Sequence, residues 1–257
     1  MQNTCLSTMS PLALLTRPRP DSEHLATLLR RQGIDSLIDP VINILPLADA
    51  ALPPLAPIQA LLLTSANGVR ALAALLGAPP VGRDKPLLAV GAATAETARA
   101  AGFHNIESAG GDVQTLAALA AKRLNPTDGP LLHIAGSRIA GDLAGLLGQQ
   151  GFDVQRQCLY QAEASTALAA ATKCALENGK IHMVLFFSPR SARGFVKLII
   201  GAALESALAQ VSAICLSKAV AEEAGKLTWR NIRVAAEPQQ AALLDEVARE
   251  IEVAEHG

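Results

Sequence analysis

The sequence predicts an α/β protein of two similar domains, each a parallel sheet with helices on both faces, joined by a two-stranded connector. Three observations support this. A unit of apolar strand, polar loop and glycine-terminated helix recurs along the chain; the last four units follow the order of the first four; and each series carries an extra extended stretch after one of its helices. Two copies of a βα series are typical of two parallel-sheet domains of flavodoxin-like design.

The first series comprises residues 12–33, 60–77, 87–102 and 105–124. In its third unit, residues 87–90 predict a buried strand, and Gly91 predicts a tight turn in which a Cβ would clash. A helix follows, with Thr94 near its start and Gly102 as its terminator. Such a turn presents backbone N–H groups and a positive helix end, which suits an anionic ligand.

The second series comprises residues 130–151, 182–201, 212–225 and 231–252. It places Ser188 opposite Ser65 of the first series. Read in chain order, the repeat divides the protein near residue 125. The extra stretches, residues 34–47 and 152–164, are each long enough for one strand within a sheet and one left over. The leftover segments stand at equivalent positions and are expected to pair as a connector.

Composition excludes several classes of function. The chain has 257 residues, half of them hydrophobic, and a formal net charge of −1, so its overall charge favours neither nucleic acid nor an anionic membrane as a partner. Aromatic residues make up only 3%, which argues against base stacking. The four cysteines are scattered, and we find no signal segment or membrane span, so a cytoplasmic location is expected.

Candidate ligand-binding residues follow the predicted strands, because folds of this kind bind ligands at the carboxyl ends of their strands. Each hydroxyl taken alone is explained as a helix N-cap, and each basic residue as a solvated surface group. Together they favour an anion-binding cleft. The candidates are Arg17, Thr64, Ser65, Ala66, Gly91, Thr94, Arg138, Ser188, Arg190, Ser217 and Lys218.

Tyr160 is the only tyrosine, and we expect it in the connector rather than in a strand of either sheet. It is either a packing residue or a general acid that faces a cleft between the domains. The five histidines have no metal-binding spacing, so they are interpreted as structural and no metal site is expected. Neither a dinucleotide-binding glycine motif nor a P-loop motif is present.

An ordered set of motifs over nearly the whole chain resembles the uroporphyrinogen-III synthase family. The motifs are LLTRP at 14–18, LLLTSANGV at 61–69, AVGAATAETARAAG at 89–102, QCLYQAE at 157–163, LFFSPRSA at 185–192 and ICLSKAVAEEAG at 214–225. The resemblance implies an enzyme of tetrapyrrole (haem) biosynthesis. This lyase cyclises hydroxymethylbilane to uroporphyrinogen III, with inversion of the terminal pyrrole ring, loss of water and no cofactor.

The resemblance also implies a chain that leaves one domain, builds the other and returns. This gives residues 1–40 and 165–257 as one domain, 47–156 as the other, and 41–46 with 157–164 as the connector. Position by position, Ser65, Thr94 and Ser188 match the family's substrate-contacting hydroxyls, and Tyr160 matches the tyrosine that assists loss of the substrate's hydroxyl group. Ser217 and Lys218 depart from the family's commoner G-x-T, and Arg138 lies in a loop that the family varies. A monomer with one small-molecule substrate, binding neither nucleic acid nor membrane, is expected.

Two other functions fit the same residues. A two-domain protein that binds or senses a small anion would share the cleft and the crossing chain, but would normally carry a signal peptide or a DNA-binding segment. A glycosyltransferase or sugar-phosphate enzyme is suggested by fold analogy alone. A sugar-nucleotide enzyme would need an acidic ribose or metal ligand after a strand, and we find none in the sequence.

Overall fold

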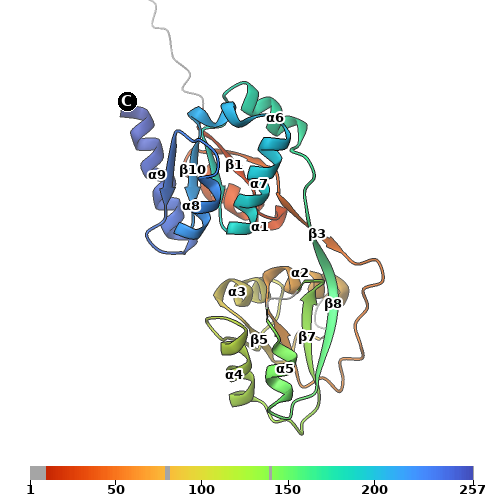
Figure 1. Ribbon diagram of the computed structural model, residues 1–257. Coiled ribbons are helices and arrows are strands. Elements are labelled where there is room, and N and C mark those ends of the chain that lie inside the picture. Colours follow the sequence, from red (N-terminus) through yellow and green to blue (C-terminus); the bar gives the residue numbers. More distant parts are fainter. Residues whose placement is uncertain (1–9, 79–81, 139–140, 257) are drawn as a thin grey trace, which may run out of the picture. The chain divides into compact units, whose positions relative to one another are not determined.

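The computed structural model describes residues 10–78, 82–138 and 141–256, which form two compact units. Unit 1 comprises the described residues up to Asn43 together with those from Glu163 onward, and unit 2 comprises Ile44–Ala162. Figure 1 shows the two ends of the colour scale in unit 1 and its middle in unit 2. The chain therefore begins in one unit, completes the other and returns.

Unit 1 contains a five-stranded parallel sheet with the order β11-β10-β9-β1-β2. Its elements are β1 (Leu12–Leu15), α1 (Arg19–Arg30), β2 (Asp35–Ile38), α6 (Ala170–Glu177), β9 (Met183–Phe186), α7 (Pro189–Gly201), the 3-10 helix Glu205–Gln210, β10 (Ser212–Cys215), α8 (Lys218–Ala224), β11 (Asn231–Val234) and α9 (Gln240–His256).

Unit 2 contains a six-stranded sheet with the order β3-β8-β7-β4-β5-β6, in which the strands from β8 to β6 are parallel. Its elements are β3 (Ile42–Pro46), β4 (Ala60–Leu63), α2 (Ala66–Leu76), β5 (Leu87–Ala89), α3 (Ala92–Ala100), β6 (Ile106–Ser108), α4 (Val113–Arg123), β7 (Leu131–Gly136), α5 (Leu143–Gly148) and β8 (Val154–Ala164).

The two sheets have the same strand order once the internal repeat is taken into account. The repeat pairs β7 with β1, β4 with β9, β5 with β10 and β6 with β11. Unit 1 then reads β2-β1-β9-β10-β11 and unit 2 reads β8-β7-β4-β5-β6. Both are the 2-1-3-4-5 order of flavodoxin-like sheets. The prediction of two similar α/β domains is confirmed. In each unit, the first two strands of this order come from one copy of the repeat and the other three come from the other copy.

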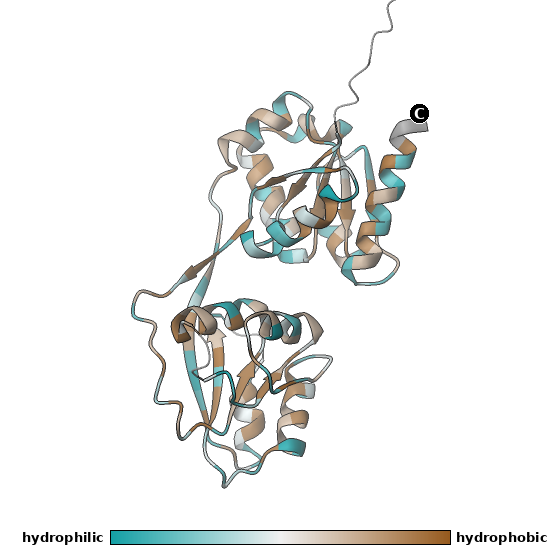
Figure 2. Ribbon diagram, turned by 180° about the vertical axis from the view of Figure 1, so that it is seen from behind, coloured by the Kyte–Doolittle hydropathy of each residue, from teal (hydrophilic) through white to brown (hydrophobic). Residues whose placement is uncertain are grey.

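Alternating strand residues explain why helices cover both faces of each sheet. In β1, Ala13 and Leu15 pack with residues of α1 and α9, whereas Leu14 packs with residues of α6, α7 and α8. The sheet of unit 2 follows the same rule, with α2 and α3 on one face and α4 and α5 on the other. Strands buried on both faces are expected to be continuous apolar runs, and the central strands of both sheets are accordingly mostly brown in Figure 2.

The connector is an antiparallel pair made by β3 and β8. The backbone N–H of Leu47 donates to Leu159 O at 3.0 Å, and that of Ser165 donates to Val41 O at 2.9 Å, so the two segments run in opposite directions. Unlike the expected two separate segments, β8 is one continuous strand of eleven residues. Tyr160 lies on it and pairs with Gly136 of β7, so the expectation that Tyr160 lies outside both sheets is wrong. The strand belongs to the sheet over much of its length and to the connector at its end.

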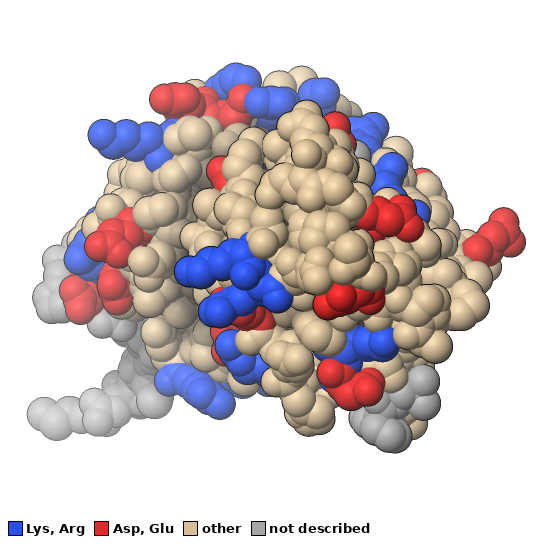
Figure 3. All heavy atoms as spheres, turned by 90° about the horizontal axis from the view of Figure 1, so that it is seen from below, with Lys and Arg blue, Asp and Glu red and all other residues tan. Residues whose placement is uncertain are grey.

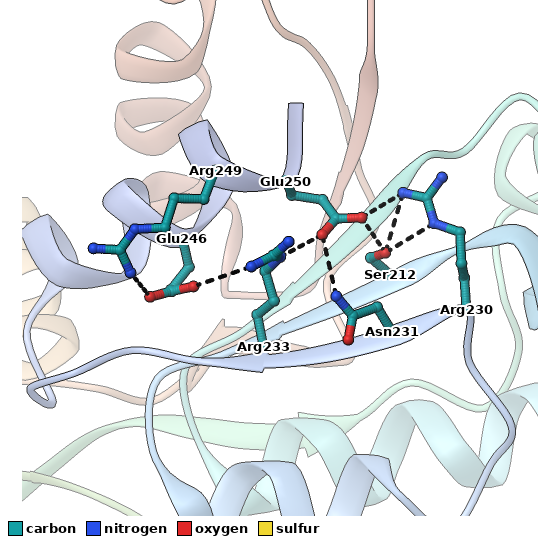
Figure 4. Close-up of polar contacts among 7 residues, drawn as sticks. All are labelled: Ser212, Arg230, Asn231, Arg233, Glu246, Arg249 and Glu250. Carbon is teal, nitrogen blue, oxygen red and sulfur yellow. Dashed lines mark hydrogen bonds and ion pairs between the residues drawn. The ribbon is translucent and has the colours of Figure 1, made fainter. Parts of the chain in front are cut away.

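A buried ionic network joins helix α9 to the sheet of unit 1, at the amino ends of the strands of that sheet (Figure 4). The Glu250 side chain is only 3% exposed and accepts a hydrogen bond from Ser212 at 2.5 Å, with further bonds from Arg230 and Arg233. Burial raises the pKa of the Glu250 carboxyl, but the bonds from Arg233, Ser212 and Arg230 outweigh it and hold that pKa below its ordinary value. Ser212 begins β10, which places this network at the sheet edge opposite to the predicted ligand edge.

Candidate functional site

The predicted ligand-binding residues lie at the carboxyl edge of each parallel sheet. In unit 1, Arg17 follows β1, Ser188 and Arg190 follow β9, and Ser217 and Lys218 follow β10. In unit 2, Thr64, Ser65 and Ala66 follow β4, Gly91 and Thr94 follow β5, and Arg138 follows β7. Because parallel strands end on the same side, each unit gathers its candidates along one edge.

Tyr160 is held across the carboxyl edge of unit 2 by two residues. Its phenolic oxygen lies 2.8 Å from Ser65 Oγ, a hydrogen-bond distance, and its side chain is only 9% exposed. Its ring lies over Gly136, where an added Cβ would be 2.8 Å from two ring carbons. Since the sheet order is β8-β7-β4, the side chain spans the end of β7 to reach Ser65, which lies beyond the end of β4. The close approach requires that β7 end without a side chain.

Ser65 combines this contact with a helix cap. It has an extended backbone (φ −159°, ψ 152°), and its Oγ accepts the backbone N–H of Gly68 at 3.0 Å, as the N-cap of α2. A serine hydroxyl has one donor and two acceptor positions, so the cap leaves the O–H free to act as a donor elsewhere. Ala66, predicted with Ser65, is the first residue of this helix.

The loop after β5 differs from its expected geometry. Gly91 has an extended backbone (φ −158°, ψ 174°) that any residue can adopt, and an added Cβ would have no atom within 4 Å. The expectation that a Cβ would clash at Gly91 is therefore wrong. Gly91, not Thr94, is the N-cap residue of α3, and Thr94 lies inside the helix, 6% exposed. The absence of a side chain at Gly91 leaves open space beside the start of α3.

A buried histidine lies on β7, the strand that pairs with the Tyr160 strand β8. His133 on β7 is 3% exposed, and its Nε2 lies 3.4 Å from Thr64 Oγ1. Burial, with a smaller contribution from the positive charge of Arg156, lowers the His133 pKa to about 4. Arg156 donates to the carbonyl oxygen of Gly136 at 2.8 Å. The neutral imidazole thus lies against the residue that follows β4, and the arginine holds the last carbonyl group of β7.

The equivalent serine of unit 1 has a different second partner. Ser188 is the N-cap of α7 and accepts the backbone N–H of Ser191 at 3.1 Å, while its Oγ lies 2.9 Å from Ser191 Oγ. Ser217 precedes α8 as its N-cap residue without a side-chain capping bond. Hydroxyl groups therefore stand at the starts of two neighbouring helices of this unit.

The basic candidates differ in how firmly they are held. The Arg17 guanidinium lies 4.3 Å from the centre of the Phe187 ring and 3.2 Å from Asp21, and it also donates to Gln240. Arg138, Arg190 and Lys218 are exposed. On the face drawn in Figure 3, cationic and anionic side chains are interspersed among uncharged ones. Positive charge for a ligand thus has to come from local groups, as the net charge predicts.

Gly136 is the site residue whose role the sequence does not reveal. In the sequence it is only part of a loop after a strand, because its importance depends on a ring that approaches from the neighbouring strand.

Among residues 10–78, 82–138 and 141–256, no cluster of three or more His, Cys, Asp or Glu side chains forms a candidate metal site. Nor does any helix in this part of the chain have the length and apolar character needed to cross a bilayer.

Known proteins resemble this chain in sequence pattern and in fold. The family model described as "Uroporphyrinogen-III synthase HemD" matches residues 23–245, most of the chain. A crystal structure of uroporphyrinogen-III synthetase from Helicobacter pylori 26695 has 18% identity and a TM-score of 0.59, and the match covers 94% of this chain and 99% of that one. A mutant uroporphyrinogen III synthase from the extremely thermophilic bacterium Thermus thermophilus has 18% identity, a TM-score of 0.49 and coverage of 95% and 99%. A search of curated proteins returned no significant match.

Proposed function

We propose, since the chain belongs to the uroporphyrinogen-III synthase family, that it converts hydroxymethylbilane to uroporphyrinogen III with inversion of the terminal pyrrole ring and release of water. Family membership makes the chain an enzyme of tetrapyrrole biosynthesis, of the lyase type, and supports this activity over the alternative of a protein that binds or senses a small anion. The solved structure from Helicobacter pylori supports the fold.

The observation that carries the proposal is the placement of Tyr160. Its hydroxyl is fixed 2.8 Å from Ser65 Oγ, at the sheet edge where folds of this type bind ligands. Loss of the substrate's hydroxyl group needs a proton donor, and a phenol is a suitable general acid. In that step the C–O bond breaks with its electron pair on oxygen, and the phenolic proton joins the oxygen to form water. A phenolate and a cationic azafulvene remain, and the phenolate is reprotonated when cyclisation releases a proton.

Carboxylate recognition is the second requirement, because substrate and product carry a carboxylate on every side arm. Helices α2, α3 and α7 begin at the carboxyl edges of their sheets, and helix N-termini attract anions. The hydroxyls of Thr64, Thr94, Ser188 and Ser217, with Arg17, Arg138, Arg190 and Lys218, are the groups that we propose for the side arms.

Orientation is the main catalytic task in this proposal. Once the azafulvene has formed, the bilane closes without enzyme but without ring inversion. The protein has to hold the chain so that the inverting attack is the near one, an effect that contributes about 7–11 kcal/mol in favourable intramolecular cases. No redox or group-transfer reagent is required by this chemistry, so we propose that the enzyme works without a cofactor. We also propose that it is a cytoplasmic monomer. Light scattering of the purified protein tests the proposed oligomeric state.

The decisive experiment is incubation of the purified protein with enzymatically made hydroxymethylbilane, followed by oxidation and chromatographic separation of isomers I and III. We expect isomer III to dominate, while a protein-free control yields isomer I. Isomer I alone in both samples would refute the proposed activity.

A further inference from the structure

Three neighbouring strands of unit 2 each contribute one residue to a single contact. Tyr160 comes from β8, Gly136 ends β7, and Ser65 follows β4. The phenol lies on the bare backbone of Gly136 and ends 2.8 Å from the Ser65 hydroxyl. A tyrosine side chain has two torsions, and here the glycine contact restrains the ring while the serine restrains its oxygen.

We infer that Ser65 and Gly136 are positioning residues for Tyr160: Gly136 leaves the space that the ring occupies, and Ser65 donates its O–H to the phenolic oxygen so that the phenolic proton points to the substrate. The inference rests on the proposed function and assigns Ser65 a role through Tyr160 instead of a direct role in binding the side arms.

Hydrogen-bond accounting allows this direction of donation, and the proposed chemistry requires it. Ser65 Oγ already accepts the backbone N–H of Gly68 at 3.0 Å. Its own proton is free to be donated, and Tyr160 provides an acceptor at 2.8 Å. If the phenol donated to Ser65 instead, its proton would be engaged and unavailable to a leaving hydroxyl. Donation from Gly68 to Ser65 also polarises the serine O–H, which strengthens the bond to the next acceptor.

The contact has a defined function during the reaction. When Tyr160 gives its proton to the leaving oxygen, negative charge develops on the phenolic oxygen. The Ser65 O–H then becomes a hydrogen bond to a charged acceptor, which is stronger than one to a neutral acceptor. The bond is therefore worth more in the transition state than in the ground state, and its loss should appear in kcat more than in KM.

A double-mutant cycle on Ser65 and Tyr160 tests the serine. We expect Ser65→Ala to lower kcat by about tenfold with little change in KM, since it removes one hydrogen bond to a charged group. Ser65→Thr, which keeps the hydroxyl, should restore most of the activity. In the Tyr160→Phe background, Ser65→Ala should have almost no additional effect, because the two residues act as one unit. If the effects of the two substitutions on kcat multiply, or if Ser65→Ala raises KM and leaves kcat unchanged, the inference is overturned.

Loss of the helix cap needs its own control, because Ser65→Ala also removes the cap of α2. Asp112 caps α4 in the same unit and lies outside the predicted site. Asp112→Ala should lower the melting temperature about as much as Ser65→Ala and leave kcat unchanged, since both variants lose one capping bond. A kcat loss of equal size in both variants would mean that stability, not positioning, explains the Ser65 result.

Gly136→Ala tests the glycine. The added Cβ would be 2.8 Å from the ring carbons Cε2 and Cζ, closer than van der Waals contact allows, so the ring has to move. We expect kcat to fall about tenfold or more, as a misplaced catalytic group causes, and the loss to disappear in the Tyr160→Phe background, where no proton donor remains to be misplaced. Gly148→Ala is the matched control, because an added Cβ there meets no atom within 4 Å. Unchanged kcat in Gly136→Ala would overturn the role of Gly136.

Failure of the inference and failure of the proposed function give different results. If the wild-type protein yields only isomer I, the proposed function fails before the cycle is run. If it yields isomer III and Tyr160→Phe remains fully active, the inference fails while the proposed function stands. If isomer III is formed and the cycle is non-additive, both stand.

Discussion

Ser65 and Ser188 occupy equivalent positions in the two units, but their hydroxyl groups have different second partners. Each follows the strand numbered 3 in the shared 2-1-3-4-5 order and caps the next helix. The second partner of Ser65 is Tyr160 at 2.8 Å, whereas that of Ser188 is Ser191 in its own helix, at 2.9 Å. The same local signal thus yields a link across the sheet in one unit and a closed helix cap in the other. The neighbouring strands, not the serine, make this difference.

The strand ends beside the two serines also differ. In unit 2, β7 ends at Gly136 and admits a ring from β8. In unit 1, β1 is followed by Thr16, which is fully buried and donates to Leu185 O, and by Arg17, whose guanidinium stacks on Phe187. We therefore expect unit 2 to supply the proton donor and unit 1 to contribute mainly to carboxylate binding. The following predictions test this division.

The largest effect is expected in unit 2, for Tyr160→Phe. The ring still fills the space over Gly136, but the proton donor is lost, so turnover should fall by more than tenfold, as is usual for a general acid. The measurement is the initial rate of uroporphyrinogen III formation in a purified coupled assay. Thr94→Ala, in helix α3 of the same unit, should lower activity less. Full activity of Tyr160→Phe would exclude the phenol as the acid.

In unit 1 the largest expected effect concerns stability. Glu250→Gln leaves Arg230 and Arg233 without the buried carboxylate that both contact, and breaking a buried ion pair on one side costs about 3 kcal/mol of unfolding free energy. Urea unfolding should show this loss, with Asp245→Asn, an exposed position on the same helix, as the control. Because the Glu250 pKa is held below its ordinary value, this stabilisation is present above that ordinary value and is lost as the pH falls through the lowered one. Equal stability of the two variants would contradict the structural role of the network.

The two units should also respond to acid over different pH ranges. His133 in unit 2 is neutral in the folded state with a pKa lowered to about 4, whereas an unfolded histidine takes up a proton near pH 6.5. The unfolded state therefore binds the proton first, and unit 2 should lose stability as the pH falls from about 6.5 to 4, by up to about 3 kcal/mol. His133→Gln should flatten this part of the profile in urea unfolding followed against pH. An unchanged slope would mean that the imidazole is not protected from protonation.

The smallest effect is expected for Ser188→Ala. It removes the α7 cap and should lower the unfolding free energy by about 1 kcal/mol, the typical value of an N-cap. If Ser188 binds a substrate carboxylate, KM rises while kcat stays close to that of the wild type. Its effect should multiply with that of Tyr160→Phe, in contrast to Ser65→Ala. A non-additive result for Ser188 would remove the distinction between the two serines.

Local sequence patterns predicted much of the fold. The apolar strands, the glycine-terminated helices and the serine caps are local features, because strand burial and capping depend on residues within a few positions of each other. The repeat then predicted two similar sheets, and the structure confirms them through their common strand order. The capping of α2 by Ser65 and of α7 by Ser188 also follows from sequence alone.

Tertiary structure decided the features that depend on neighbours distant in the chain. The continuity of β8, the open space beside Gly91 and the approach of Tyr160 to Gly136 were not predicted, because each depends on how separate strands align at the sheet edge. A serine in the sequence identifies a cap but not the second partner of its hydroxyl. Only the order β8-β7-β4 places a phenol from one strand beside a serine after another, 95 residues away. The sequence by itself thus determined the two sheets and their capped helices, and the packing of the strands determined which of the two equivalent serines meets the tyrosine.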